Sequence, residues 1–143
     1  MNLDDVEVRV NKPYPEIVNA VDDKGTVAVL KNLLSSRVSE LTAVLQYTYQ
    51  SVVAGSMEKE ISQIFEEISI VEMMHMEMLM EAIKDFGGNP KFEDAFGNAF
   101  SSNYVFYSNK LIDMLNANIA GEKKAIEEYS NAITKVKNES LKN

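Results

Sequence analysis

The spacing of proline and glycine limits this chain to long helices joined by few turns. Its 143 residues include three prolines and six glycines, and neither type occurs within 26–54 or 57–86. In these segments and in 108–136, apolar residues recur every three or four positions, as on one helix face. We therefore predict three long helices over about 26–54, 57–86 and 108–136. On the third, the residues expected to face inward are Leu111, Leu115, Ile119, Ile126, Tyr129 and Ile133.

Glycine and proline also mark the ends of these helices. Gly55 follows the first predicted helix, and Ser56 can act as N-cap of the next. The run Gly87-Gly88-Asn89-Pro90 stops the second helix. The stretch 91–107 is rich in aromatic residues and lacks helical spacing. A connection of this length can carry the chain back along a bundle, so that the third helix runs parallel to the second.

The first 25 residues differ from the rest of the chain. Apolar and charged residues alternate over 6–10, and Pro13 and Pro15 disfavour helix. We predict an extended N-terminal arm over 1–25 and one helical domain over 26–143. The expected fold class is all-α: a bundle of three long helices with a crossover loop. Residues 138–143 resemble the cap and first turn of a fourth helix, which would be absent or supplied by a partner chain.

The composition excludes several classes of function. The 22 acidic and 14 basic side chains give a net charge of −8, so no nucleic acid or anionic membrane partner is expected. The chain has no cysteine, which excludes disulfides, thiolate catalysis and sulfur-ligated metal sites. No apolar run approaches a membrane span, and the first residues lack the pattern of a signal peptide. We expect a cytoplasmic protein.

Three glutamates interrupt the apolar faces of the predicted helices. Glu40, Glu72 and Glu122 each have apolar residues one or two turns before and after them, although burying an unpaired carboxylate is costly. His75, the only histidine, follows Glu72 by one helical turn and so shares its face. A carboxylate on each of three helices, with Glu-x-x-His on one, is most simply explained by a bound cation. The other reading is a buried, hydrogen-bonded cluster without metal.

Two of these glutamates belong to an internal repeat. Residues 40–47 and 122–129 share the pattern Glu-x-x-Ala-(Val/Ile)-x-x-Tyr, which ends in Tyr47 and Tyr129. We read both tyrosines as core residues with hydrogen-bonded hydroxyls rather than as redox groups. A second Glu-x-x-His at the same offset would fall beyond Asn143.

With these motifs, the chain resembles the ferritin-like superfamily, in particular its rubrerythrin-like and bacterioferritin-like members. The resemblance covers about 29–138 and rests on the segments 39–47, 71–75, 87–90 and 121–122. It implies a dinuclear iron or manganese centre with the ligands Glu40, Glu72, His75 and Glu122, in which Glu72 bridges the metals. Tyr47 would lie beside the metals without binding them, and no catalytic residue is expected beyond the ligands. The fourth helix of that family, with its own Glu-x-x-His, is missing from the pattern.

The resemblance implies an oxidoreductase that acts on peroxide, oxygen or Fe(II): a rubrerythrin-like peroxidase, a ferroxidase or a manganese-catalase-like enzyme. Any electron donor would be a separate protein, because the chain has no cysteine for a rubredoxin-type centre. The alternative is a non-enzymatic helical assembly protein with a degenerate or incomplete metal site. A three-helix bundle leaves an apolar groove, so we expect a homo-oligomer, most simply a dimer. Two copies of the first two helices would supply four glutamates and two histidines.

Overall fold

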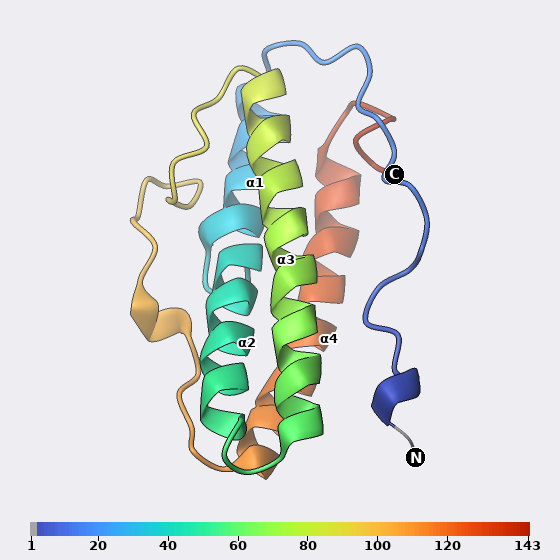
Figure 1. Cartoon of the computed structure of the whole chain (residues 1–143). Coiled ribbons are helices and arrows are strands. Elements are labelled where there is room, and N and C mark those ends of the chain that lie inside the picture. Colours follow the sequence, from blue (N-terminus) through green and yellow to red (C-terminus); the bar gives the residue numbers. More distant parts are fainter. Residues whose placement is uncertain (1–2) are drawn as a thin grey trace.

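The computed structural model describes residues 3–143 as a bundle of upright helices (Figure 1). The α-helices are α1 (Lys24–Ser35), α2 (Glu40–Ala54), α3 (Lys59–Asp85) and α4 (Leu111–Lys135). Short 3-10 helices lie at Leu3–Asp5 and Ser102–Tyr104. Within 3–143 there is no strand, only an isolated bridge between Glu93 and Ala99. The predicted all-α class is thus confirmed.

The prediction of one unbroken helix over 26–54 is wrong. This segment instead forms two helices, α1 and α2, which are separated by residues 36–39. Serine at both ends of this segment favours capping over a continuous helix, because its hydroxyl competes for backbone groups. Ser39 Oγ accepts a hydrogen bond from the backbone N–H of Thr42, and Thr42 Oγ1 donates to the carbonyl of Ser36. A new helix therefore starts at Glu40.

The connections follow the predicted path. A tight turn joins α2 to α3, and these two helices form the most extensively packed pair. The α3 helix ends at Asp85, where Gly87 adopts a positive φ of 85° that a side chain would strain. The crossover then runs back along the bundle, so that α4 rises in the same direction as α3 (Figure 1).

Two clusters of buried apolar residues hold the bundle together. The upper one joins α1, the end of α3 and α4 around Leu34, Ile83 and Ala132. The lower one surrounds Tyr47 and Phe65, with Met114 contributed by α4. The three glutamates of the apolar faces lie on the stretch of bundle between the two clusters.

Polar side chains also attach α4 to α2. Gln46 Nε2 donates to Asn118 Oδ1 at 3.0 Å, and Asn118 Nδ2 donates to Gln50 Oε1 at 2.6 Å. Asn118 is 7% exposed and Gln50 is fully buried. Gln50 Nε2 has no hydrogen-bond partner among the described residues. The register of α4 on α2 thus depends on a buried amide network.

The predicted inward face of α4 is partly wrong. Ile119, Ile126 and Ile133 are 55%, 67% and 45% exposed, and Ile112 continues their seven-residue spacing at 63%. The buried residues of this helix are instead Met114, Asn118 and Ala132. The apolar face of α4 is wider than the surface that α1 and α2 cover, so an isoleucine stripe (Ile112, Ile119, Ile126 and Ile133) faces outward.

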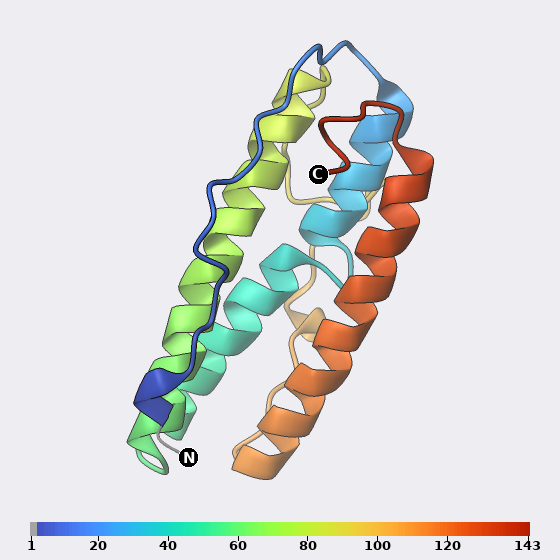
Figure 2. The ribbon, with the colours of Figure 1, turned by 90° about the vertical axis from the view of Figure 1, so that its right-hand side faces the viewer.

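The N-terminal segment 6–23 is extended and lies along α3 (Figure 2). Residues 139–142 form turns rather than a helix, and Asn138 Oδ1 accepts from the backbone N–H of Leu141. Whether 1–25 and 26–143 act as separate units stays a prediction. None of the helices described is long and apolar enough to cross a membrane.

Candidate metal centre

The break between α1 and α2 sets the position of Glu40. It is the first residue of α2, and its side chain is buried at 7% exposure. A helix N-terminus carries a partial positive charge, which stabilises a carboxylate in the first turn. Ser39 caps this turn and so fixes where the carboxylate enters the bundle.

The α3 helix presents Glu72 and His75 to the same point. His75 Nδ1 donates to Glu72 Oε2 at 3.0 Å and lies 3.8 Å from Glu40 Oε2. One ligand atom from each of these three residues lies within 4.8 Å of the other two. The Glu72 side chain is 13% exposed and that of His75 is 35% exposed. Two carboxylates and an imidazole from two helices therefore converge.

Glu122 lies apart from these three residues. It is an exposed residue of α4, and its Oε1 accepts a hydrogen bond of 2.9 Å from the hydroxyl of Tyr47. It is not among the residues whose ligand atoms converge within 4.8 Å. Among the predicted site residues, the structure thus brings Glu40, Glu72 and His75 together, whereas Glu122 is hydrogen-bonded to Tyr47 and lies outside this group.

Tyr129 has a closer relation to the cluster than the sequence indicated. Its hydroxyl donates to Glu40 Oε1, so it contacts a candidate ligand directly. Tyr47 and Tyr129 occupy the same place in the two repeats, and each donates to the glutamate of the other repeat. The repeat was the signal that could have identified this second contact.

The protonation of Glu72 and His75 follows from burial and from their proximity. Burial raises the pKa of Glu72 to about 7, and the negative charge of Glu40 adds to this shift against the hydrogen bond from His75. Hydrogen bonding to Glu40 and Glu72 raises the pKa of His75 to about 10, although burial opposes it. Without metal, the imidazole is therefore protonated at neutral pH.

The remaining groups respond to the same charges. Burial opposes ionisation of Glu40, but hydrogen bonds from His75, Glu72 and Tyr129 outweigh it and lower the pKa of Glu40. Loss of water around its carboxylate raises the pKa of Glu122 despite the bond from Tyr47. Burial and the nearby carboxylates raise the pKa of Tyr47 and Tyr129, so both phenols keep their protons.

The charge of the cluster suits a bound cation. When Glu40, Glu72, Glu122 and His75 are all ionised, three negative charges face one positive charge in a partly desolvated space. A metal that binds His75 displaces the imidazole proton, so three carboxylate charges then remain for bound divalent metal to offset. Carboxylate oxygens with an imidazole nitrogen are ligands that iron and manganese accept. The donor set therefore fits the metals implied by the resemblance.

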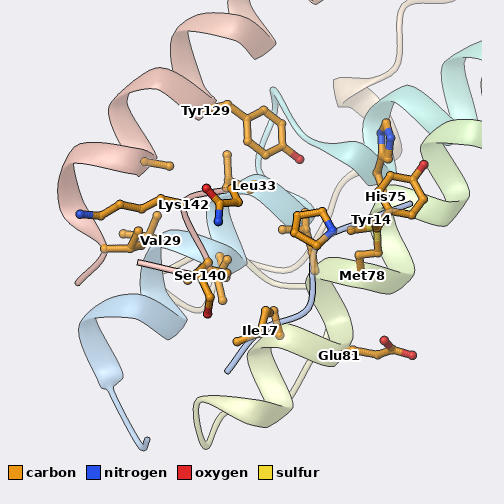
Figure 3. A pocket seen from close by; sticks show the side chains of 18 of the residues that line it. Tyr14, Ile17, Val29, Leu33, His75, Met78, Glu81, Tyr129, Ser140 and Lys142 are labelled. Carbon is orange, nitrogen blue, oxygen red and sulfur yellow. The ribbon is translucent and has the colours of Figure 1, made fainter. Parts of the chain in front are cut away.

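Two cavities give access to the cluster. A groove of about 760 Å³ lies between the N-terminal arm, α3, α4 and the C-terminal turn, and reaches Glu40 and His75 (Figure 3). A second cavity of about 540 Å³ lies between α2 and α4 and includes Glu72 and Glu122. Tyr14 of the arm lines the groove, although nothing local in the sequence assigned it to the site.

Known structures share this fold. Two crystal structures of KatB, a manganese catalase from Anabaena, superpose with TM-scores of 0.81 and 0.83. Each is 24% identical to this chain, and each match covers 94% of this chain and 68% of the catalase chain. Identity at this level establishes the fold alone. No curated protein sequence matches this chain.

The match to a family model is more direct. The model that describes the ferritin-like domain matches residues 30–140, which include α2, α3, α4 and all four candidate ligands. The helical bundle with its long crossover agrees with that match. The chain belongs to the ferritin-like domain family.

Proposed function

We propose that this protein binds a dinuclear iron or manganese centre and acts as an oxidoreductase on peroxide, oxygen or Fe(II). The observation that carries the proposal is the convergence of Glu40, Glu72 and His75, with ligand atoms within 4.8 Å of one another in a partly buried site. Buried carboxylates that face one another are costly unless a cation is bound between them.

Glu40, Glu72, His75 and Glu122 would hold the metals. Tyr129 and Tyr47 orient Glu40 and Glu122 by hydrogen bonding to one oxygen of each, which leaves the other oxygen available. When bound, iron or manganese would supply the redox steps, for which the side chains of this cluster are not suited. Similarity to a manganese catalase supports manganese, whereas the donor atoms suit both metals.

We propose two kinds of partner for this protein, an electron donor and further copies of the same chain. Because the chain has no cysteine, electrons for a peroxidase would come from a separate donor protein. We also propose that the protein forms a homo-oligomer, in the simplest case a dimer, since the isoleucine stripe is an apolar strip along the whole of α4. A cytoplasmic location stays a prediction from composition.

One observation favours a second candidate, a helical assembly protein that binds no metal. Each carboxylate of the cluster already has a hydrogen-bonded partner: Tyr129 for Glu40, His75 for Glu72 and Tyr47 for Glu122. Such a network can be stable without a cation, because buried polar groups that are hydrogen-bonded cost little.

Metal analysis of the purified chain separates the two functions. We expect the wild type to retain iron or manganese after loading and desalting, and Glu72→Ala to retain almost none. Glu77→Ala is the matched control, because Glu77 is an exposed glutamate of the same helix. The assembly function would be supported instead if the wild type retains no metal and Glu72→Ala unfolds at the same denaturant concentration as the wild type or at a higher one.

If metal binds, the reaction is identified by its substrate. Loaded protein should release oxygen from hydrogen peroxide as a catalase, oxidise Fe(II) as a ferroxidase, or reduce peroxide only when a donor is added. Loaded protein that does none of these would contradict the enzymatic part of the proposal.

A further inference from the structure

The N-terminal arm is fastened to the bundle on both sides of the cluster. The first anchor lies on the N-terminal side of Tyr14, where Arg9 Nη1 donates to Met74 Sδ of α3 at 3.9 Å. Beyond Tyr14, the backbone N–H of Val18 donates to Ser140 Oγ at 2.9 Å, and Asn138 Nδ2 donates to the carbonyl of Val18 at 2.9 Å. The arm is therefore a strap that spans residues 9–18 between two anchors.

Tyr14 lies between these anchors in the sequence Pro13-Tyr14-Pro15. Each proline restricts its own φ and keeps the preceding residue extended, so the segment is stiff. The Tyr14 ring meets the His75 ring edge to face, with centroids 6.0 Å apart and planes at 85°. Figure 3 shows Tyr14 beside His75 and Met78 on one wall of the groove.

His75 has the least protected side chain of the three converging residues, at 35% exposure. The hydrogen bond to Glu72 and the ion pair with Glu40 both involve Nδ1. These two contacts therefore hold one edge of the imidazole, and tilting of the ring about that edge is only weakly restricted. Perpendicular aromatic packing is favourable and directional. A ring held against the imidazole by a stiff strap restricts this tilting.

We propose that Tyr14 is a positioning residue for His75, and that the strap couples the arm to the metal centre. The placement of the imidazole depends only on the fold, whereas the coupling rests on the proposed function. Coupling between two sites is reciprocal. A metal that fixes His75 therefore strengthens docking of the arm, and a docked arm strengthens metal binding.

The placement is tested on metal-free protein by NMR of the His75 ring, which gives a single set of imidazole signals because the chain has one histidine. Tyr14→Leu should shift these signals by removing the ring current, whereas Tyr14→Phe should shift them much less. Val10→Ala, an exposed change elsewhere on the arm, is the control for general loosening. Ring signals in Tyr14→Leu that match the wild type would overturn the proposal.

The coupling is tested on loaded protein by metal affinity and by proteolysis. Tyr14→Leu should weaken metal binding about two- to tenfold, as expected for loss of one aromatic pair, and Tyr14→Phe should restore it. Trypsin should cleave the Arg9–Val10 bond more slowly in loaded than in metal-free wild type, and this difference should shrink in Tyr14→Leu. Equal cleavage rates with and without bound metal would refute the coupling. A wild type that binds no metal would refute both the proposed function and the coupling, and the NMR result would still decide the placement.

Discussion

The hydroxyl of Tyr47 on α2 donates to Glu122 on α4 at 2.9 Å, while Tyr129 on α4 donates to Glu40 on α2. The two repeats thus exchange hydrogen bonds across the bundle. Both tyrosines keep their protons, because burial and the nearby carboxylates raise their pKa. Each is therefore a permanent donor to a candidate metal ligand.

Removing these hydroxyls should have unequal effects. Tyr129→Phe deprives the buried Glu40 of a donor and should lower the free energy of unfolding by about 2 kcal/mol, a typical value for a hydrogen bond to a charged group. Tyr47→Phe should cost about 1 kcal/mol, since Glu122 is less buried than Glu40 and water can partly replace the phenol. Urea denaturation of metal-free protein measures both values, and equal losses would contradict this ranking.

The stability of metal-free protein should depend on pH through His75 and Glu72. Both pKa values are raised in the folded chain, to about 10 for His75 and about 7 for Glu72, so the folded state holds protons that the unfolded state releases. The contribution of Glu72 to the free energy of unfolding is complete below about pH 4.5 and is lost as the pH rises through about 7. That of His75 is complete below about pH 6.5 and lost as the pH rises through 10. The urea concentration at the unfolding midpoint should therefore decrease as the pH is raised from 7 to 10. His75→Gln should make this decrease smaller.

Metal binding should release protons at neutral pH. The hydrogen bonds to Glu40 and Glu72 keep His75 protonated, and a metal that coordinates His75 displaces that imidazole proton. Metal affinity should therefore increase by up to about tenfold for each unit of rising pH and each proton released. Calorimetry in two buffers of different ionisation enthalpy counts these protons directly. Binding heats that do not depend on the buffer would show that His75 keeps its proton and is not a ligand.

The amide network between α2 and α4 should make Asn118 important for stability. Asn118→Ala removes the only donor seen for Gln50 Oε1 among the described residues and leaves a second buried amide group unsatisfied. We expect a loss of about 1–3 kcal/mol. Asn116→Ala, an exposed change on the same helix, should cost far less. Similar losses for both variants in urea would indicate helix propensity rather than the network.

The isoleucine stripe should mediate self-association. Ile126→Lys places a charge at the centre of the stripe and should convert the oligomer to a monomer in light scattering after size-exclusion chromatography. Asn131→Lys adds the same charge at an exposed position of α4 outside the stripe and should leave the oligomer intact. A wild type that is monomeric at high concentration would contradict this proposal.

Periodicity was sufficient to predict the helical class, the crossover and the place of α3. It failed at 36–39, because capping by Ser39 depends on backbone geometry that apolar spacing does not report. It also failed for Ile119, Ile126 and Ile133, since spacing identifies an apolar face and cannot say whether another helix covers it.

The candidate site was predictable where its residues belong to local motifs. Glu40, Glu72 and His75 stand out as polar residues within apolar faces, and they converge. Glu122 belongs to the same repeat as Glu40, yet it lies outside the converging set and accepts a hydrogen bond from Tyr47 instead. Tyr14 reaches His75 through the path of the arm, a contact between distant residues that no local pattern encodes.

The order of the candidate ligands along the chain has a consequence for biosynthesis. Glu40, Glu72 and His75 all precede the crossover and lie on the closely packed pair of α2 and α3. Contacts between neighbouring helices form early, since little chain entropy is lost in closing a short loop. A nascent chain that has emerged from the ribosome as far as Asp85 therefore already contains the three converging candidate ligands, before α4 has emerged.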